Sequence, residues 1–409
     1  MCTPGSCCAA TARCRGAQRS AGYLEWCRRY SRLHKLRAVP TLTQPARILF
    51  VTFDAGGNFP PVITLGREFA RRGHRVTVLG HAQQRSKVEA ARFEFISYSN
   101  APSWSSSRHK STASTLWGYL ALFTTRTLVD DAVAASREAD LVVVDCMLLP
   151  VMSAVNALPQ PTIALFHAYY AYLDGPWRRG PIGVVARLRG LSSRRIWGSA
   201  DLQVVISDQA LDPAGRRHRV AGNIFWTGPA EPVARPLTPR TPPTVLASLS
   251  TTYFPAQQQT MQNILDAAAT LPIRLIATTG PAIDASRLRV PANAELHEYV
   301  PHADVLPECV AVIGHGGHST TFQALAHGLP LIVMPMHPLL DQPMVGRSVA
   351  RAGAGIVLRK KASAARIASA LSRILNEPGY SASAQAIGDR LASGDGTTRA
   401  VDRMLAELD

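Results

Sequence analysis

Short apolar runs alternate with amphipathic stretches along most of the chain. The first run, RILFVTFD at residues 47–54, is followed by a Gly-rich loop, a helical pattern that ends near His74, and a second apolar run at 75–80. This order is typical of a β-loop-α-β unit that begins a parallel sheet. We expect further strands at 93–98, 141–145, 161–166 and 202–207. The pattern predicts a mostly parallel sheet in this part of the chain.

The alternation stops at a Pro-rich tract, residues 227–243, and then restarts. After it we expect a helix over 256–269 and strands at 244–250, 273–280, 295–300, 310–314, 330–335 and 354–359. The chain therefore predicts a first domain at 46–226, a linker at 227–243 and a second domain at 244–409. Both would be α/β, with Rossmann-like, doubly wound parallel sheets facing a cleft, where ligands of such sheets bind.

Charge and cysteine content narrow the class of protein. The formal net charge is +16, and residues 1–45 carry eight basic residues against one acidic residue. The excess suits an anionic small ligand or a membrane surface, and no zinc-finger spacing or aromatic-studded basic strand favours nucleic acid. Five of the seven cysteines lie in residues 1–45, which lack the apolar core of a secretory signal. We expect a disordered leader, or an upstream start codon, and a cytoplasmic monomer or homodimer whose Cys146 and Cys309 are core residues.

The stretch from Val312 to Pro330, VIGHGGHSTTFQALAHGLP, predicts a strand, a glycine loop and a helix. Glycines let a backbone approach a ligand closely, and the free N–H groups of a helix start attract anions. His315, His318 and the adjacent hydroxyls would add side-chain donors. These features favour a diphosphate, although Thr320 and Gln323 also fit a capping box that serves the helix alone.

Residues 315–343, HGGHSTTFQALAHGLPLIVMPMHPLLDQP, resemble the donor-binding signature of family 1 glycosyltransferases, the UDP-glycosyltransferase superfamily with the GT-B fold. The similarity extends over residues 46–405 and implies a bacterial natural-product type of enzyme. It implies diphosphate contacts from His315, Gly316, Gly317, His318, Ser319 and Thr320, with Ser250 and Thr251 beside the phosphates. It also implies nucleobase contacts from Tyr299 and Val300, ribose contacts from Gln323, and sugar contacts from Asp341 and Gln342. Gln323 replaces the usual Glu, a hint toward a thymidine diphosphate donor.

The amino-terminal domain departs from the family pattern. The resemblance implies a catalytic His after the first strand and an Asp after a later strand that orients it. Asn58 stands in the place of that His, whereas Asp145 matches the Asp. An amide cannot act as a base, so Asp145, directly or through a water, and His167 are the candidates. The alternative interpretation of His167 is a polar loop residue, which is the commoner case for such a histidine, and His81 could also border the cleft.

The acceptor side is rich in aromatic and basic residues. We expect residues 104–128 and 169–197 to line it, and the aromatic run HAYYAYLDGPW from His167 suits a flat apolar acceptor. The basic run at 178–195 is either a solvated face or a contact with anionic lipid.

Together these features predict an inverting hexosyltransferase with no metal and no cofactor. It would move a sugar from a UDP- or dTDP-sugar to a hydroxyl of an apolar small molecule or lipid. The alternatives are a catalytically weak sugar-nucleotide-binding helper and a GT-B epimerase or hydrolase.

Overall fold

A computed structural model describes residues 44–55, 57–101, 112–215, 223–228, 238–338, 340–392 and 394–408. The predicted leader, except for its last two residues, and positions 229–237 of the predicted linker lie outside these ranges. Residues 41–409 form one compact unit. Within the described ranges, every helix is too short or too polar to cross a bilayer.

The amino-terminal part contains a seven-stranded parallel sheet in the order β3-β2-β1-β4-β5-β6-β7. Its strands are β1 (Arg47–Val51), β2 (Arg75–Gly80), β3 (Glu94–Ser97), β4 (Leu141–Asp145), β5 (Thr162–Phe166), β6 (Leu202–Val205) and β7 (Ile224–Trp226). Six of these follow the predicted apolar runs. The sequence did not indicate β7, because three residues are too short to show a period.

The second part contains a six-stranded parallel sheet in the order β10-β9-β8-β11-β12-β13. Its strands are β8 (Thr244–Ser248), β9 (Arg274–Thr278), β10 (Ala294–His297), β11 (Cys309–Gly314), β12 (Leu331–Val333) and β13 (Gly355–Val357). In both sheets the strand order reverses beside the first strand, which confirms the predicted pair of doubly wound α/β sheets.

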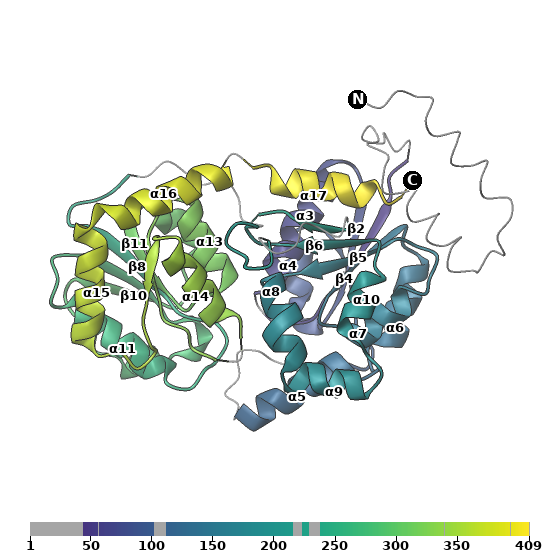
Figure 1. Ribbon diagram of the computed structural model, residues 1–409, viewed down its shortest axis with the longest axis horizontal. Helices are drawn as coiled ribbons and strands as arrows, with labels where there is room; N and C mark the ends of the chain where they lie inside the picture. The colour runs from purple at the N-terminus through teal and green to yellow at the C-terminus, as the bar shows by residue number, and fades with distance from the viewer. Residues whose placement is uncertain are drawn as a thin grey trace, which may run out of the picture. The chain divides into compact units, whose positions relative to one another are not determined.

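Helices cover both sheets (Figure 1). In the amino-terminal part these are α3 (Phe59–Arg71), α4 (Arg85–Ala90), α5 (Thr112–Thr124), α6 (Val129–Arg137), α7 (Leu149–Val155), α8 (Tyr170–Tyr172), a π-helical turn (Leu173–Trp177), α9 (Pro181–Leu188) and α10 (Ser193–Gly198). In the second part they are α11 (Gln257–Ala268), α12 (His302–Val305), α13 (His318–Ala326), α14 (Gln342–Arg351), α15 (Ala364–Asn376) and α16 (Pro378–Ala392), and α17 (Gly396–Leu405) follows. Four short 3-10 turns complete the set: Ala82–Gln84, Gly280–Ala282, Ala285–Arg287 and Leu306–Glu308.

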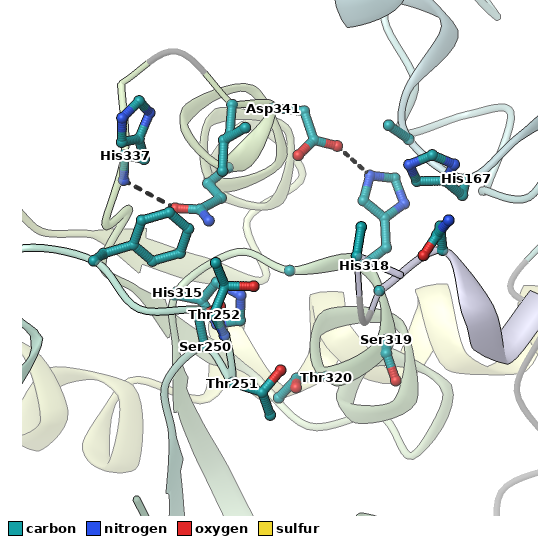
Figure 2. Close-up of a pocket in the computed structure, with 18 of the residues that line it drawn as sticks. His167, Ser250, Thr251, Thr252, His315, His318, Ser319, Thr320, His337 and Asp341 are labelled. Carbon is teal, nitrogen blue, oxygen red and sulfur yellow. Dashed lines mark hydrogen bonds and ion pairs between the residues drawn. The ribbon is translucent and has the colours of Figure 1, made fainter. Parts of the chain in front are cut away.

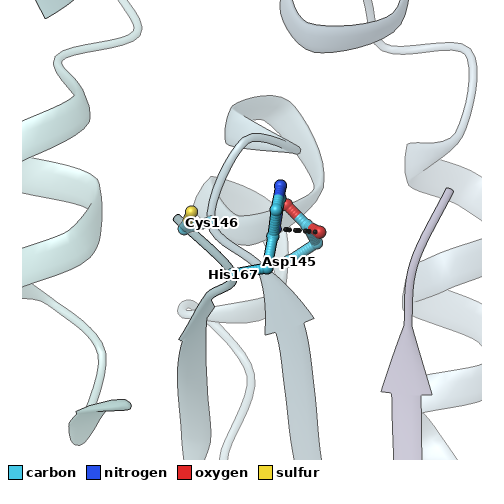
Figure 3. Close-up of side chains that lie close together, drawn as sticks. All are labelled: Asp145, Cys146 and His167. Carbon is cyan, nitrogen blue, oxygen red and sulfur yellow. Dashed lines mark ion pairs between the residues drawn. The ribbon is translucent and has the colours of Figure 1, made fainter. Parts of the chain in front are cut away.

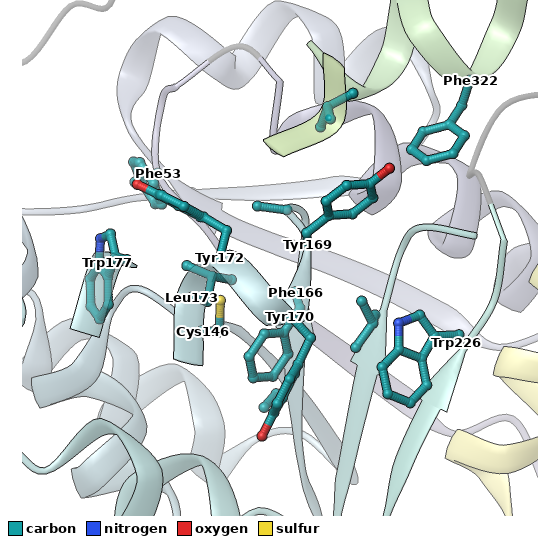
Figure 4. Close-up of a cluster of buried hydrophobic side chains, with 14 of the residues drawn as sticks. Phe53, Cys146, Phe166, Tyr169, Tyr170, Tyr172, Leu173, Trp177, Trp226 and Phe322 are labelled. Carbon is teal, nitrogen blue, oxygen red and sulfur yellow. The ribbon is translucent and has the colours of Figure 1, made fainter. Parts of the chain in front are cut away.

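An aromatic cluster at the end of β5 joins the two parts (Figure 4). The Phe166 ring lies 5.1 Å from that of Tyr170, and Tyr169 packs against Phe322 of α13 at 6.4 Å. Tyr169 and Tyr170 are buried in this core, whereas Tyr172 and Trp177 border the pocket described below. The aromatic run expected to line an acceptor site therefore does so only in part.

Helix α17 belongs by contact to the amino-terminal domain, although its sequence position placed it in the second. It packs on α3 and β7, and its apolar stripe joins the core beneath the first sheet. Arg72 of α3 and Asp402 of α17 form an ion pair with 2.5 Å between Nη1 and Oδ1. The pattern predicts an amphipathic helix here, but a period of 3.6 does not say which surface the helix covers.

We expect Met404→Ala to destabilise the protein, because Met404 of α17 is fully buried against this core. Loss of its side chain should lower the free energy of unfolding by about 3 kcal/mol. Urea unfolding followed by circular dichroism measures the change. Arg403→Ala is the control on the exposed face of the same helix, and a Met404→Ala curve that overlays it would contradict the packing.

Candidate functional site

A cavity of about 610 Å³ lies between the carboxyl ends of the two sheets. One wall, from the amino-terminal domain, is mainly apolar and includes Phe53, Leu116, Tyr119, Phe123, Met147, Tyr172, Trp177 and Ile182. The other wall is mainly polar and includes Ser248, Ser250, Thr251, Thr278, His302, His315, His318, Ser319, Thr320, Gln323, Asp341 and Gln342. The two walls differ in chemistry, so the cavity suits two ligand parts of different polarity. Figure 2 shows part of the polar wall, with His167 across from His318.

The start of α13 forms part of the polar wall. The helix begins after Gly317, and Gly316 has a φ of +86°, which favours glycine. A Cβ atom on Gly317 would lie 2.5 Å from Nε2 of His315, so the absence of a side chain leaves room for that ring. The first backbone N–H groups of α13 have no partner within the helix and make this wall suited to an anion.

The expected capping box is not formed. Gly317 occupies the N-cap position, and Nε2 of Gln323 donates instead to Oγ of Ser319 at 2.9 Å. Gln323 therefore lies at the pocket wall with its amide held toward the helix start. This leaves Thr320 at the wall without a helix-capping role.

His315 is held in its neutral form. Burial lowers the pKa of His315 to about 4, an effect that the charge of Asp341 opposes only in part. A neutral imidazole can donate one hydrogen bond but adds no positive charge to the anion site.

His318 is paired with Asp341 at the start of α14. Its Nε2 donates to Oδ2 of Asp341 at 2.6 Å, and the Tyr169 ring stands edge-on to it with 5.0 Å between centroids. Next to Asp341, Oε1 of Gln342 accepts from the backbone N–H groups of Met336 and His337, at 2.8 and 3.1 Å. Asp341 and Gln342 thus come from the start of one helix, and both border the pocket. Figure 2 shows the bond between Asp341 and His318.

The remaining predicted donor-side residues also border the pocket. Tyr299 is 75% exposed with Val300 beside it, so a ring face is open to a planar group. Ser250 and Thr251 lie just beyond β8, where Oγ of Ser250 accepts from the N–H of Thr252 at 3.1 Å. Of the predicted donor residues, Gly316 is absent from the pocket wall, since it lies against the backbone of Gln342.

On the apolar wall, a buried carboxylate brings three segments together. Oδ2 of Asp145 lies 3.1 Å from Nδ2 of Asn58 and 3.0 Å from Nδ1 of His167, and Oδ1 accepts from the N–H of Met147 at 3.0 Å. Asn58 also donates to the carbonyl of Phe53 at 2.9 Å. The three predicted catalytic candidates are therefore one cluster, in which Asn58 and His167 both contact Asp145. His81 is buried beside this region and is absent from the pocket wall.

His167 has the electrostatics of a base supported by a carboxylate. Burial lowers the pKa of His167, but the charge of Asp145, the contact with its carboxylate and the charge of Asp341 raise the pKa above its ordinary value overall. Because Nδ1 faces Asp145, Nε2 is the ring nitrogen left for another ligand.

The cluster of Asp145, Cys146 and His167 has the residue types of a metal site (Figure 3). Burial raises the pKa of the Cys146 thiol well above its usual range, so the thiolate that a metal needs is disfavoured. The carboxylate is already held by the amide of Asn58 and the N–H of Met147. This donor set suits a proton-transfer pair better than a metal.

The pocket wall also contains residues that the sequence motifs did not indicate. Nε2 of His302 lies 3.1 Å from Oγ of Ser248, which accepts from the hydroxyl of Thr278 at 2.9 Å, and all three border the pocket. His337 borders it as well. The sequence could have indicated this group, because Ser248 and Thr278 stand at the ends of neighbouring parallel strands.

The chain is similar in sequence to several known proteins. The family model of the C-terminal domain of erythromycin biosynthesis protein CIII-like proteins matches residues 262–408. A PGL/p-HBAD biosynthesis rhamnosyltransferase of Mycobacterium bovis is 31% identical over 223 residues, 51% of this chain and 47% of the relative. The 4'-demethylrebeccamycin synthase of Lentzea aerocolonigenes is 32% identical over 131 residues, 32% of this chain and 30% of the relative. The chain spans about half the length or less of these curated relatives.

Solved structures share the whole fold. The calicheamicin glycosyltransferase CalG4 has a TM-score of 0.72 at 22% identity, with 90% of this chain and 99% of that chain covered. The kitacinnamycin glycosyltransferase has a TM-score of 0.70 at 20% identity, with 90% and 100% covered. The fold is therefore GT-B, as the resemblance implied.

The sequence similarity to a known family model therefore covers residues 262–408. The matched segment contains α13 and the start of α14, which form part of the polar wall.

The neutral form of the buried His315 predicts acid sensitivity. Its folded pKa, about 4, lies below the ordinary value near 6.5, so the unfolded chain binds a proton first as pH falls. Stability should therefore decrease between about pH 6.5 and pH 4, by about 1–3 kcal/mol from this group. His315→Gln removes the contribution, and calorimetry should show a smaller drop in Tm over that interval. Parallel pH curves for the two proteins would contradict the assignment.

Proposed function

We propose that the protein transfers a sugar from a nucleotide diphosphate to a hydroxyl group of an apolar acceptor, with inversion at the anomeric carbon. The observation that carries the proposal is one cavity with a His167–Asp145 pair on its apolar wall and the helix start of α13 on its polar wall. A base and an anion site face the same space, as a displacement between a hydroxyl and a diphosphate requires.

The polar wall would hold the donor. Backbone N–H groups at the start of α13, with Ser319 and Thr320, would meet the diphosphate, and the helix dipole would stabilise its charge as it leaves. Asp341, fixed by His318, would accept hydrogen bonds from sugar hydroxyls, with Gln342 beside it. Since these groups neutralise the leaving diphosphate, the proposed reaction needs no metal and no cofactor.

The chemistry follows from this placement. The acceptor oxygen attacks the anomeric carbon, the bond from that carbon to the diphosphate oxygen breaks, and the bond electrons leave with the diphosphate. The acceptor proton moves to Nε2 of His167, and Asp145 stabilises the imidazolium that forms. Attack from the side opposite the leaving group gives inversion.

Among the three candidates, His167 is the base that we propose. Asn58 carries no titratable group, and its Nδ2 is engaged with Asp145. Asp145 is buried behind His167 and is absent from the pocket wall, whereas His167 borders the pocket. Asn58 and Asp145 would then position the imidazole and hold its tautomer.

For the nucleotide we propose thymidine diphosphate ahead of uridine diphosphate. Gln323 brings an amide, tied to Ser319, where a carboxylate would bind two ribose hydroxyls more strongly. Two structural neighbours support this, since the spinosyn rhamnosyltransferase SpnG is described in complex with thymidine diphosphate and the glycosyltransferase VinC with dTDP. SpnG is also described with its spinosyn aglycone, which supports an apolar acceptor on the opposite wall.

The two alternative functions are less well supported. An epimerase would surround the sugar with carboxylates, but the described pocket residues include only Glu298 and Asp341 of that type. A non-catalytic helper was suggested by Asn58, and the imidazole of His167 supplies the base that Asn58 lacks.

The donor assignment is tested through Asp341. We expect Asp341→Ala to reduce turnover at least 100-fold, because the sugar loses a hydrogen-bond acceptor and His318 loses its partner. Mass spectrometry of nucleotide-sugar hydrolysis and transfer, scanned over dTDP- and UDP-sugars in the presence of a chelator, provides the measurement. Asp389→Asn, an exposed carboxylate on α16, serves as the control, and wild-type rates in Asp341→Ala would end the donor assignment.

The pH profile tests the base. Turnover should rise with pH as His167 loses its proton, with an apparent pKa above the ordinary value. His167→Ala should lower kcat about 10²–10⁴-fold with nucleotide affinity unchanged. Asp145→Asn removes the charge that raises the pKa of His167, so its weaker activity should rise at a lower pH than in the wild type. Lys87→Ala is the pocket-wall control, and an unshifted profile in Asp145→Asn would show that Asp145 does not act through His167.

A further inference from the structure

Two helices of the amino-terminal domain expose large apolar side chains beside the pocket. Trp117 on α5 is 75% exposed and Leu188 on α9 is 81% exposed. Among the large apolar side chains in the described ranges, Tyr299 at the pocket rim is the other one exposed to this degree. Exposed apolar side chains that gather on adjacent elements mark an interaction surface.

The two helices form one surface. Helix α5 packs against α9, and Nη1 of Arg189 donates to the carbonyl and hydroxyl oxygens of Thr124, at 3.2 and 2.6 Å, which ties their carboxyl ends together. They lie side by side at the lower edge of the view in Figure 1. The same helices supply Leu116, Tyr119, Pro181 and Ile182 to the pocket wall. The exposed surface, which we call the α5–α9 face, therefore adjoins the proposed acceptor side.

The segments that contain this face and the adjacent helix α10 carry charge of a single sign. Residues 112–128 and 175–200 contain no Asp or Glu. Their arginines are Arg126, Arg178, Arg179, Arg187, Arg189, Arg194 and Arg195. The neighbouring Asp174 pairs with Arg178 and Arg194. Arg179, Arg187 and Arg195 are exposed and form no ion pair with any carboxylate in the described ranges.

We propose that the α5–α9 face docks on the surface of an anionic lipid bilayer. Tryptophan is enriched at membrane interfaces, aliphatic side chains enter the acyl boundary, and arginines bind anionic headgroups. A bilayer presents a uniform negative charge, which matches two helices without carboxylates and the exposed Arg187 of α9, with Arg179 just before α9 and Arg195 on the adjacent α10. A protein partner would more often present charges of both signs together with a shape-matched pocket for the tryptophan.

Docking in this way would place the acceptor side of the pocket near the lipid. An acceptor with an alkyl chain could then reach the apolar wall without crossing water. The inference does not depend on sugar transfer, because a bilayer contact is measured without donor or acceptor.

Vesicle sedimentation of the full chain provides the test, with phosphatidylcholine vesicles that contain or lack phosphatidylglycerol. We expect binding to the anionic vesicles only, and loss of this binding at high salt. Arg187→Gln with Arg195→Gln should weaken the binding on the order of fivefold per arginine. Trp117→Ser with Leu188→Ser should weaken it at least tenfold. Matched controls on the second domain are Arg287→Gln with Arg366→Gln, and Val290→Ser, all exposed, and these should bind like the wild type.

The outcomes separate this face from other sources of binding. Residues 1–45 are themselves basic, so wild-type binding by both pairs of variants would assign the contact elsewhere and overturn the proposal. Failure of the wild type to bind anionic vesicles would overturn it as well. Self-association that depends on Trp117, seen in sedimentation without vesicles, would replace the bilayer by a second copy.

Hydrogen exchange of the wild type gives a measurement that needs no variant. Backbone amides in α5 and α9 should exchange more slowly when anionic vesicles are added, and those of α15 should not change. Unchanged exchange in α5 and α9 on bound protein would count against the face. Nucleotide affinity of the variants, measured by calorimetry, should equal that of the wild type, so failure of this proposal and failure of the proposed function are distinguishable.

Discussion

The buried carboxylate of Asp145 constrains the architecture of the amino-terminal half of the site. A charge that is only 3% exposed is costly unless its oxygens have partners. Here the partners come from the loop before α3, the turn after β4 and the end of β5. Meeting that demand fixes the relative positions of Asn58, Met147 and His167, so one electrostatic requirement determines where the proposed base stands.

A corresponding arrangement exists on the opposite wall, where Asp341 holds His318. The two pairs differ in their surroundings. His167 stands on an apolar wall against the Phe53 ring, with 6.2 Å between centroids, whereas His318 opens a helix rich in hydroxyl groups. Because of these neighbours, the two walls favour different ligands. One wall favours an apolar molecule that can give up a proton, and the other favours a charged molecule.

Much of the fold was predictable from the sequence, because buried parallel strands appear as short β-branched runs and doubly wound sheets place ligands at their carboxyl ends. The motif at the start of α13 was equally readable, since its glycines and hydroxyls are contiguous. The contact of His167 with Asp145 depends on strand pairing: Asp145 lies in register with Leu165, and His167 follows two residues later on the same side. The register between β4 and β5 is set by the tertiary structure. The sequence alone therefore left Asn58, Asp145 and His167 as candidates for the catalytic site. The domain on which α17 packs could not be predicted for a similar reason, because an amphipathic pattern does not say which surface the helix covers.

The return of α17 to the amino-terminal domain has a mechanical consequence. The chain passes between the two sheets twice, once in the segment after β7 and once between α16 and α17. Two crossings restrain the rotation of one sheet relative to the other more than a single connection would. The ion pair between Arg390 and Asp208, with 2.9 Å between Nη2 and Oδ1, lies close to the second crossing.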